Sequence, residues 1–197
     1  MIDPAGDPAG GQTGPRMRLD RFENPGFSRG ASRLTEMVWM LLSALAFSTW
    51  LPGSGWRVSV LRAFGATVGQ GVVIKPHVTV KFPWRLVLGD HVWIGERVWI
   101  DNLAPVTVGA HSCISQGAYL CTGSHDWSDP SFGLITRPIS IGRGCWVGAQ
   151  ARLAPGAVLE DGAILAMGAL GKGRLGAGQI RLADGSERVR NHSEPPC

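Results

Sequence analysis

The sequence predicts an all-β solenoid, a parallel β-helix, over most of a 197-residue chain. Apolar residues recur every six positions from Val68 onward, the chain contains 28 glycines, and the six-residue count is interrupted at regular intervals. An α-helix would repeat its apolar residues about every 3.6 positions and a simple strand every two. The glycines do not follow the three-residue period of collagen. Short repeats of this kind indicate a solenoid.

Fourteen six-residue repeats, or hexads, carry this pattern, and each begins with Ile, Val or Leu. In thirteen of them the fifth residue is Val, Ala, Ser or Cys, and Trp84 is the exception. We expect each hexad to form one side of a three-sided coil, with its first residue inward and its fifth beside a tight turn. Successive coils then pair as parallel strands about 4.8 Å apart. The hexads begin at residues 68, 74, 80, 88, 94, 100, 108, 114, 120, 141, 147, 153, 159 and 165.

The count is interrupted three times, after residues 80–85, 100–105 and 120–125. Two of these steps are eight residues long and the third is twenty-one. Each follows a complete set of three hexads, so all three insertions are expected at one edge of the prism, which we call the insertion corner. The longest insertion, the loop 126–140 or flap, contains two prolines and two aromatic residues. Loops of this length in a compact domain are usually functional or disordered, and this composition favours an ordered, extruded loop.

The rest of the chain completes a four-part organisation. Residues 1–18 are rich in Pro and Gly, show no secretory signal and are expected to form a disordered tail. An apolar helical segment is expected at 19–64, a β-helix of about five coils at 65–175, and a C-terminal extension at 176–197. Residues 37–51 are apolar but shorter than the ~20 residues of a membrane-spanning helix. They predict a helix packed on the domain or lying in a membrane interface.

The composition narrows the possible functions. Apolar residues make up 44% and charged residues 17%, which excludes a wholly disordered chain. The formal charge is only +4, and the sequence contains no run of five basic residues, so no nucleic-acid groove is expected. A smaller polyanion, such as a nucleotide-like cofactor, suits this charge. The four cysteines form no CxxC pair and are expected to be reduced thiols.

The five histidines differ in their place in the repeat. His77, His91 and His111 occupy the fourth position of their hexads and are expected at turns, and His192 lies in the polar end of the chain. His125 closes the last hexad before the flap, at the insertion corner. An imidazole titrates near neutrality and can take a proton from a hydroxyl group. His125 is therefore the candidate general base.

Three segments connect the chain with a known family: FPWRLVLGDHVWIGERVWIDNLAPVTVG, ISQGAYLCTGSHDW and PISIGRGCWVGAQARLAPGAVL. With them the chain resembles the hexapeptide-repeat acyltransferases of the left-handed parallel β-helix fold, over roughly 19–190. Among these it is similar to the colanic-acid-biosynthesis type of sugar O-acetyltransferase. The resemblance implies a left-handed coil, a homotrimer with sites shared between subunits, and acetyl-CoA as co-substrate. It also implies acetyl transfer to a saccharide hydroxyl, in exopolysaccharide or related saccharide biosynthesis.

The resemblance assigns roles to individual residues. It implies that His125 is the catalytic base. From their place at the insertion corner, and not from the resemblance, Asn102, Asp101 and Trp127 are candidates for acceptor binding, with orientation of the thioester as the alternative for Asn102. Asp126 is a candidate for orienting the imidazole. The implied cofactor contacts lie on the coils after the flap, at Trp146, Gly148, Ala149, Ala166 and Gly168.

Other functions remain open at this point. One is a same-fold acetyltransferase with a non-sugar acceptor, such as an amine, and another is a non-catalytic scaffold. Carbonic anhydrases on this scaffold have two zinc-binding histidines five residues apart, and no such pair exists here, so no metal is expected. The expected location is the cytoplasm, with the inner face of the membrane as an option. A lipid-linked saccharide and peripheral membrane contact through 37–51 are expectations of the same kind.

Overall fold

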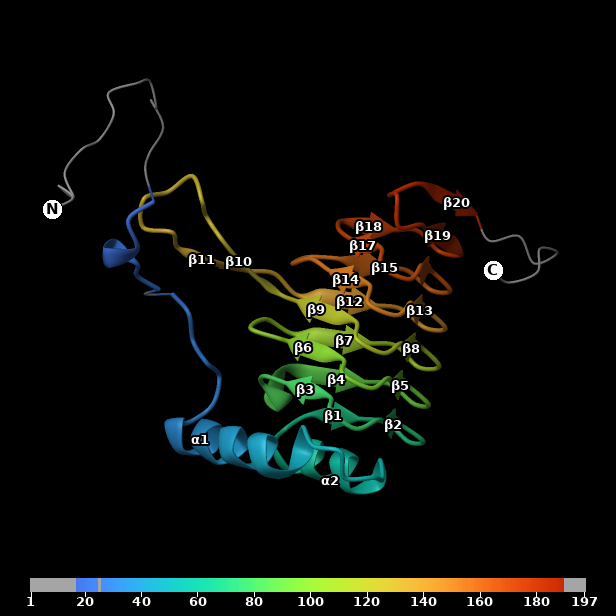
Figure 1. Cartoon of the computed structure of the whole chain (residues 1–197), viewed down its shortest axis with the longest axis horizontal. Coiled ribbons are helices and arrows are strands. Elements are labelled where there is room, and N and C mark those ends of the chain that lie inside the picture. Colours follow the sequence, from blue (N-terminus) through green and yellow to red (C-terminus); the bar gives the residue numbers. More distant parts are fainter. Residues whose placement is uncertain (1–16, 25, 190–197) are drawn as a thin grey trace, which may run out of the picture. The chain divides into compact units, whose positions relative to one another are not determined.

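The computed structural model describes residues 17–24 and 26–189, and it divides into two compact units (Figure 1). One unit contains Ser28–Ser124 and the chain from Thr136 onward, and the other combines the N-terminal residues up to Phe27 with His125–Ile135. Most of the expected tail, the last residues of the C-terminal extension, His192 and Cys197 lie outside the described residues.

The larger unit is a solenoid with three parallel sheets, which we call sheets A, B and C (Figure 1). Facing residues on neighbouring coils of the first part are twenty positions apart, as in the pair Thr67 and Val87. Five coils have all three sides and a sixth has two, so the predicted parallel solenoid is confirmed.

The strands of each sheet follow one another coil by coil. Sheet A contains β1 Thr67–Val68, β4 Leu86–Leu88, β7 Val106–Val108, β12 Ile139–Ile141, β15 Val158–Leu159 and β18 Arg174–Leu175. Sheet B contains β2 Val73–Ile74, β5 Trp93–Ile94, β8 Cys113–Ile114, β13 Trp146–Val147, β16 Ile164–Leu165, β19 Gln179–Arg181 and the antiparallel β20 Glu187–Val189. Sheet C contains β3 Thr79–Val80, β6 Trp99–Asp101, β9 Tyr119–Cys121, β14 Arg152–Leu153 and β17 Leu170–Gly171.

The hexad explains the core. The first residue of all fourteen hexads is buried, and so is the fifth in all except those of Trp84 and Ser124. Each fully buried Ile, Val or Leu contributes about 1.5–3 kcal/mol. The fourth residue has a positive φ in eleven hexads, including His77 (59°), His91 (55°) and His111 (60°), which confirms their position at turns.

The coils approach one another so closely at their corners that some hexads require glycine at the second position. A Cβ atom on Gly148 would lie 2.5 Å from the Met167 nitrogen and 2.7 Å from the Ala166 carbonyl carbon. Both neighbours are backbone atoms of the next coil, which cannot move without breaking the strand pairing.

The solenoid continues beyond residue 175, because β19 pairs in parallel with β16. Gly171 takes the inward position that Ile, Val or Leu takes in earlier coils, and Arg181 takes the inward position of β19. The buried guanidinium of Arg181 donates to the carbonyl of Lys172 at 2.9 Å and to Glu187. With these partners the Arg181 side chain covers the end of the core. Neither Gly171 nor Arg181 fits the apolar repeat from which the coils were predicted.

Helices close the other end of the solenoid (Figure 1). They are α1 Arg33–Leu42, the π-helical η2 Ser43–Phe47 and α2 Gly55–Ala63. The hydroxyl of Ser32 accepts from the Thr35 N–H and caps α1. The indole of Trp39 is buried and donates to the Val80 carbonyl at 3.0 Å, which ties α1 to the first coil. None of the described helices has the length and apolar character needed to cross a membrane.

The smaller unit combines the flap with the N-terminal chain. The strands β10 Gly123–His125 and β11 Leu134–Thr136 pair at the two ends of the flap, and η1 Leu19–Arg21 lies in the N-terminal part. The Arg18 N–H donates to the Pro130 carbonyl at 2.8 Å, and the Leu134 N–H donates to Asn24 Oδ1 at 3.0 Å. These contacts join segments 110 residues apart in sequence, a pairing that the hexad count gave no means to find.

Candidate active site

The three insertions lie at one corner, as predicted. They connect sheet C to sheet A, following β3, β6 and β9 and preceding β4, β7 and β12. Because β3, β6 and β9 are in parallel register, equivalent positions of the first two insertions stack with a spacing of twenty residues.

Side chains hold this corner together where the regular turn is lost. Asn102 is fully buried, its Oδ1 accepts from the Phe82 N–H at 2.9 Å, and its Nδ2 donates to the Phe82 carbonyl at 2.7 Å. One coil later, the Thr122 hydroxyl donates to the Asp101 carbonyl at 3.0 Å and accepts from the Ala104 N–H at 2.9 Å. Buried backbone groups need partners, and here side chains supply them. The geometry of Asn102 favours a role in positioning the corner over direct contact with an acceptor.

Asp101 lies in a polar cluster on the outer side of the same coils. Its Oδ1 is 3.1 Å from Lys81 Nζ, and its Oδ2 accepts from the Tyr119 hydroxyl at 3.1 Å. Burial, helped by neighbouring Cys121 and Asp101, raises the pKa of Tyr119, so the phenol remains a hydrogen-bond donor. Lys81, Asp101 and Cys121 are twenty residues apart, and aligning the coils at that period would have revealed this cluster from the sequence.

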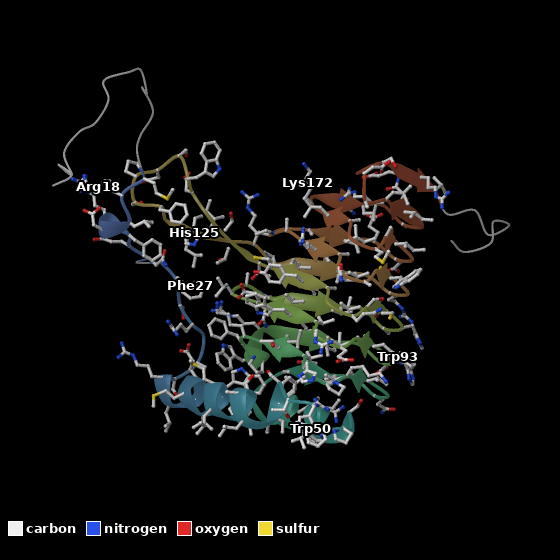
Figure 2. All side chains as sticks on the ribbon, viewed as in Figure 1. Arg18, Phe27, Trp50, Trp93, His125 and Lys172 are labelled. Atoms are coloured by element: carbon white, nitrogen blue, oxygen red, sulfur yellow. The ribbon has the colours of Figure 1, made fainter. Side chains whose placement is uncertain are left out.

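His125 is held by the flap itself (Figure 2). Its Nδ1 lies 2.9 Å from the carbonyl oxygen of Phe132. A carbonyl can only accept, so Nδ1 carries the proton, and in the neutral ring Nε2 then presents a lone pair. The Phe132 ring stacks on the imidazole at 4.3 Å with an angle of 3°, and the Phe22 ring lies 5.7 Å away at 56°. The backbone of Phe132 has a positive φ of 49°, a conformation uncommon for non-glycine residues.

Sequence reasoning missed Phe22 and Phe132, because neither occupies a position in the repeat. It also named Asp126 as a candidate for orienting the imidazole. The Asp126 carboxylate instead accepts from the Ser128 N–H at 3.0 Å and from the Ser128 hydroxyl at 2.5 Å. These hydrogen bonds lower the pKa of Asp126. Trp127 is 78% exposed, so its ring is available to a ligand.

Four of the five residues expected to bind the cofactor lie on a different corner, between sheets B and C, and the fifth, Trp146, lies in the adjoining strand β13. Gly148 and Ala149 follow β13, and Ala166 and Gly168 follow β16 one coil later, with the Gly168 N–H donating to the Ala149 carbonyl at 2.9 Å. Trp146 is half-exposed and donates through Nε1 to Ser115 Oγ at 2.8 Å. Gly148 is buried, and its N–H already donates to the Leu165 carbonyl at 2.7 Å.

Gly168 is an open position on this corner. It is exposed, and a Cβ atom built there would meet nothing within 4 Å. The packing of the coils therefore requires the glycine at 148, whereas the space at 168 is open to a ligand. Within residues 17–24 and 26–189 no group of three or more His, Cys, Asp or Glu side chains could hold a metal ion.

Comparisons with known proteins agree with the fold. Residues 138–170 match the family model described as the hexapeptide repeat of succinyl-transferase. The putative colanic acid biosynthesis acetyltransferase WcaF of Escherichia coli is 41% identical over 149 residues, which cover 75% of this chain and 81% of WcaF.

Solved structures show the same architecture at low identity. A maltose O-acetyltransferase from Clostridium difficile superposes with a TM-score of 0.70 at 15% identity, covering 83% of this chain and 90% of that one. A hexapeptide-repeat acetyltransferase from Vibrio cholerae, solved with acetyl coenzyme A, superposes with a TM-score of 0.70 at 17% identity, covering 82% and 90%. With the parallel hexad solenoid and the extent of its identity to WcaF, the chain belongs to the hexapeptide-repeat acetyltransferases, a family of acyltransferases.

Proposed function

We propose that this protein transfers an acetyl group from acetyl-CoA to a saccharide hydroxyl, in exopolysaccharide or related saccharide biosynthesis. The relatives support this acceptor class, since WcaF is named for colanic acid biosynthesis and a structural neighbour for maltose O-acetylation. The observation that carries the proposal is the imidazole of His125, whose Nδ1 is bound to the Phe132 carbonyl and whose Nε2 is left as a base.

In the proposed reaction, Nε2 of His125 takes the proton of the acceptor hydroxyl. The hydroxyl oxygen attacks the thioester carbonyl carbon of acetyl-CoA, and the carbon–sulfur bond breaks as the ester forms. Coenzyme A leaves as a thiolate and recovers a proton from the imidazolium. The Phe132 carbonyl accepts from Nδ1 throughout, which keeps the ring in the tautomer that the first step needs. The stack with the Phe132 ring holds the plane of the imidazole.

Asp101 on the solenoid and Trp127 on the flap are each proposed as acceptor-binding residues. Asp101 is oriented by Lys81 and by the Tyr119 hydroxyl, and a fixed carboxylate accepts well from sugar hydroxyls. The exposed indole of Trp127 offers an apolar face for a sugar ring. Asn102 is assigned to positioning of the corner.

Acetyl-CoA is proposed to lie along the corner between sheets B and C. Ala149, Ala166 and Gly168 have small side chains on the two stacked turns and permit close approach to the backbone, while Trp146 provides an exposed indole beside them. Gly148 contributes by letting the two coils meet, as its blocked Cβ position indicates.

We propose that the sites are completed in a homotrimer. Within one chain the flap leaves the solenoid between sheets C and A, whereas the proposed acetyl-CoA residues lie between sheets B and C. A second copy would bring the two kinds of corner together. The outward residues of sheet B supply an apolar surface for that contact: Val73, Trp93, Cys113, Trp146 and Ile164 follow one another in register.

The proposed location is the cytoplasm, where acetyl-CoA is available, at the inner face of the membrane if the acceptor is carried on a lipid. The apolar residues within 37–51 support peripheral contact with that face.

The experiment is to follow free thiol release from acetyl-CoA with a panel of sugars and lipid-linked saccharides. His125→Ala should lower the acceptor-dependent rate by about 100-fold or more, the usual contribution of a general base. His111→Asn is the matched control, because His111 is an exposed turn histidine with a φ of 60° that Asn tolerates. This control should keep the wild-type rate.

Other results distinguish the remaining functions. A product that resists hydroxylamine is an amide, and it would replace the saccharide by an amine acceptor. Saturable coenzyme A binding without turnover would be consistent with an acetyltransferase whose acceptor is not among the sugars and saccharides tested. Absence of both binding and turnover would favour a non-catalytic scaffold and remove the role of His125.

A further inference from the structure

The helical end of the larger unit carries an apolar stripe that faces away from the solenoid. Along α1 and η2 the residues at positions i, i+3, i+4, i+7 and i+11 are exposed and apolar, with Leu34 70% exposed. This spacing places them on one side of a helix. Figure 2 shows side chains projecting from α1 on the side away from the strands. We call this surface the outer face; it consists of Leu34, Met37, Val38, Leu41 and Leu45.

The opposite side of the same helical segment is already occupied by protein contacts. Trp39 and Phe47 are buried against the first coil, and their rings lie 5.2 Å apart. Glu36 is buried on this side too and forms an ion pair with Arg29. The segment is thus fixed with Glu36 inward and several of its leucines outward, unlike an ordinary surface helix. The outer face is therefore left without a covering element in the described chain.

The loop after η2 carries an exposed tryptophan, Trp50, and a buried arginine, Arg57, fixes the conformation of this loop. Arg57 is fully buried and donates to the carbonyls of Phe47 at 3.3 Å, Thr49 at 3.1 Å, Leu51 at 2.5 Å and Gly53 at 2.7 Å. These bonds fix the loop between η2 and α2, on which Trp50 is 70% exposed (Figure 2). Exposed tryptophans of this kind are enriched where protein meets the headgroup region of a membrane.

The net positive charge of the chain comes from this region. Residues 28–77 contain five basic side chains and one acidic side chain, Glu36, while the rest of the chain contains fourteen of each. The whole excess of +4 therefore lies in the helices and the first turns of the solenoid. Arg33 is exposed at the start of α1, whereas Arg57 is buried and Arg62 donates to the carbonyls of Val68 and Gly69. An apolar strip with an exposed arginine at one end matches a bilayer that contains anionic lipids.

We propose that the outer face and Trp50 bind the surface of an anionic lipid bilayer, with α1 lying in the plane of the interface. Ten residues of α-helix are about 15 Å long, half of the ~30 Å hydrocarbon core, so the segment lies on the membrane and does not span it. A two-fold contact with a second copy would set the basic region against itself. The proposal rests on the peripheral membrane contact proposed above and does not depend on which acceptor the enzyme uses.

The test is flotation of the full chain with vesicles of phosphatidylcholine alone and of phosphatidylcholine with phosphatidylglycerol. The wild type should bind the mixed vesicles more tightly. The double variant Leu41→Glu/Leu45→Glu should lose at least about tenfold in binding, because two exposed leucines no longer enter the interface. Arg33→Gln should weaken binding to the mixed vesicles by about fivefold and leave phosphatidylcholine binding unchanged.

Two controls separate this surface from general stickiness and from misfolding. Val189→Glu alters a comparably exposed apolar residue on β20, at the far end of sheet B, and should bind vesicles like the wild type. Circular dichroism and the melting temperature of the Leu41/Leu45 variant should match the wild type, since both leucines are exposed. Trp50 gives a direct readout: vesicles should shift the fluorescence of the wild type to the blue, and Trp50→Phe should show a smaller shift.

Three results would overturn the proposal. One is absence of wild-type flotation with either vesicle. Another is equal flotation of the wild type and the Leu41/Leu45 variant. The third is a change in oligomeric state, by light scattering, in the Leu41/Leu45 variant together with no vesicle binding by the wild type, which would make the outer face a contact between copies.

Discussion

Backbone groups at the corners of the solenoid need hydrogen-bond partners. The corner between sheets B and C, which we call the regular corner, and the insertion corner supply these partners in different ways. At the first, each of the five links has four residues, and the third of them has a positive φ (His77, Arg97, Gly117, Gln150 and Gly168). Backbone groups of stacked links bond directly there, as the Gly117 N–H does to the Glu96 carbonyl at 2.8 Å. At the insertion corner the side chains of Asn102 and Thr122 supply much of this pairing.

The difference separates a corner held by repeated backbone bonds from a corner held by individual side chains. A link of fixed length repeats its backbone bonds in every coil, so its side chains need only be small or turn-forming. The links of the insertion corner depart from the regular turn, and polar side chains supply partners for their backbone groups. Those residues give the insertion corner its own side-chain pairings.

The largest expected effect is on the regular corner. Gly148→Ala should lower the free energy of unfolding by about 3 kcal/mol, because its Cβ would press on backbone atoms of the next coil at 2.5 Å and 2.7 Å. Gly55→Ala is the matched control, since nothing lies within 4 Å of its Cβ position, and it should change stability by less than about 1 kcal/mol. Urea denaturation at one protein concentration measures both. Equal effects of the two substitutions would mean that the coils can separate at this corner.

The insertion corner should be sensitive to a side chain instead. Asn102→Ala should cost about 2 kcal/mol, because the buried N–H and carbonyl of Phe82 lose their partner. Gln116 is the matched control, because it is also the third residue of a hexad but is exposed at the corner between sheets B and C. Gln116→Ala should change the free energy of unfolding by less than about 0.5 kcal/mol. The same denaturation series decides, and similar losses would erase the contrast between the corners.

The flap should affect rate without affecting the solenoid. Phe22→Leu should lower kcat by about fivefold, through looser orientation of the His125 imidazole, with the KM for acetyl-CoA unchanged. Leu19→Ala, at an exposed position of the same segment, should match the wild type. A Phe22→Leu variant with normal kcat would show that the aromatic contact is structural.

The smallest effect concerns Cys145, which fills the fifth position of its hexad. Burial raises the pKa of its thiol, so the folded chain keeps this proton at a pH where the unfolded chain releases it. Stability should therefore fall as the pH rises past the ordinary thiol pKa of about 8.5, and fall less in Cys145→Ala. Cys145 should also react with a thiol reagent at least about tenfold more slowly than the partly exposed Cys113. Equal labelling rates would contradict the burial.

Much of the fold could be predicted, because the hexad is a local pattern. Inward residues, turn positions and the shared corner of the insertions all follow from counting in sixes. The last coils were harder to predict from the sequence, because Gly171 and Arg181 take inward positions where the repeat expects an aliphatic residue. Leu153 and Leu165 approach within 3.1–3.3 Å of a Cβ built on Gly171, and neighbouring leucines thus fill the space of the missing side chain.

The sequence by itself determined the solenoid, the place of its insertions and the candidate base His125, because a six-residue period leaves each side chain one direction to face. Only the tertiary structure decided which partners these residues take. It gave Asn102 to the Phe82 backbone, Asp101 to Lys81 and Tyr119, and His125 to the Phe132 carbonyl. It also turned the leucines of α1 outward. Such pairings depend on where twenty-residue coils and distant segments meet, and no local period encodes that meeting.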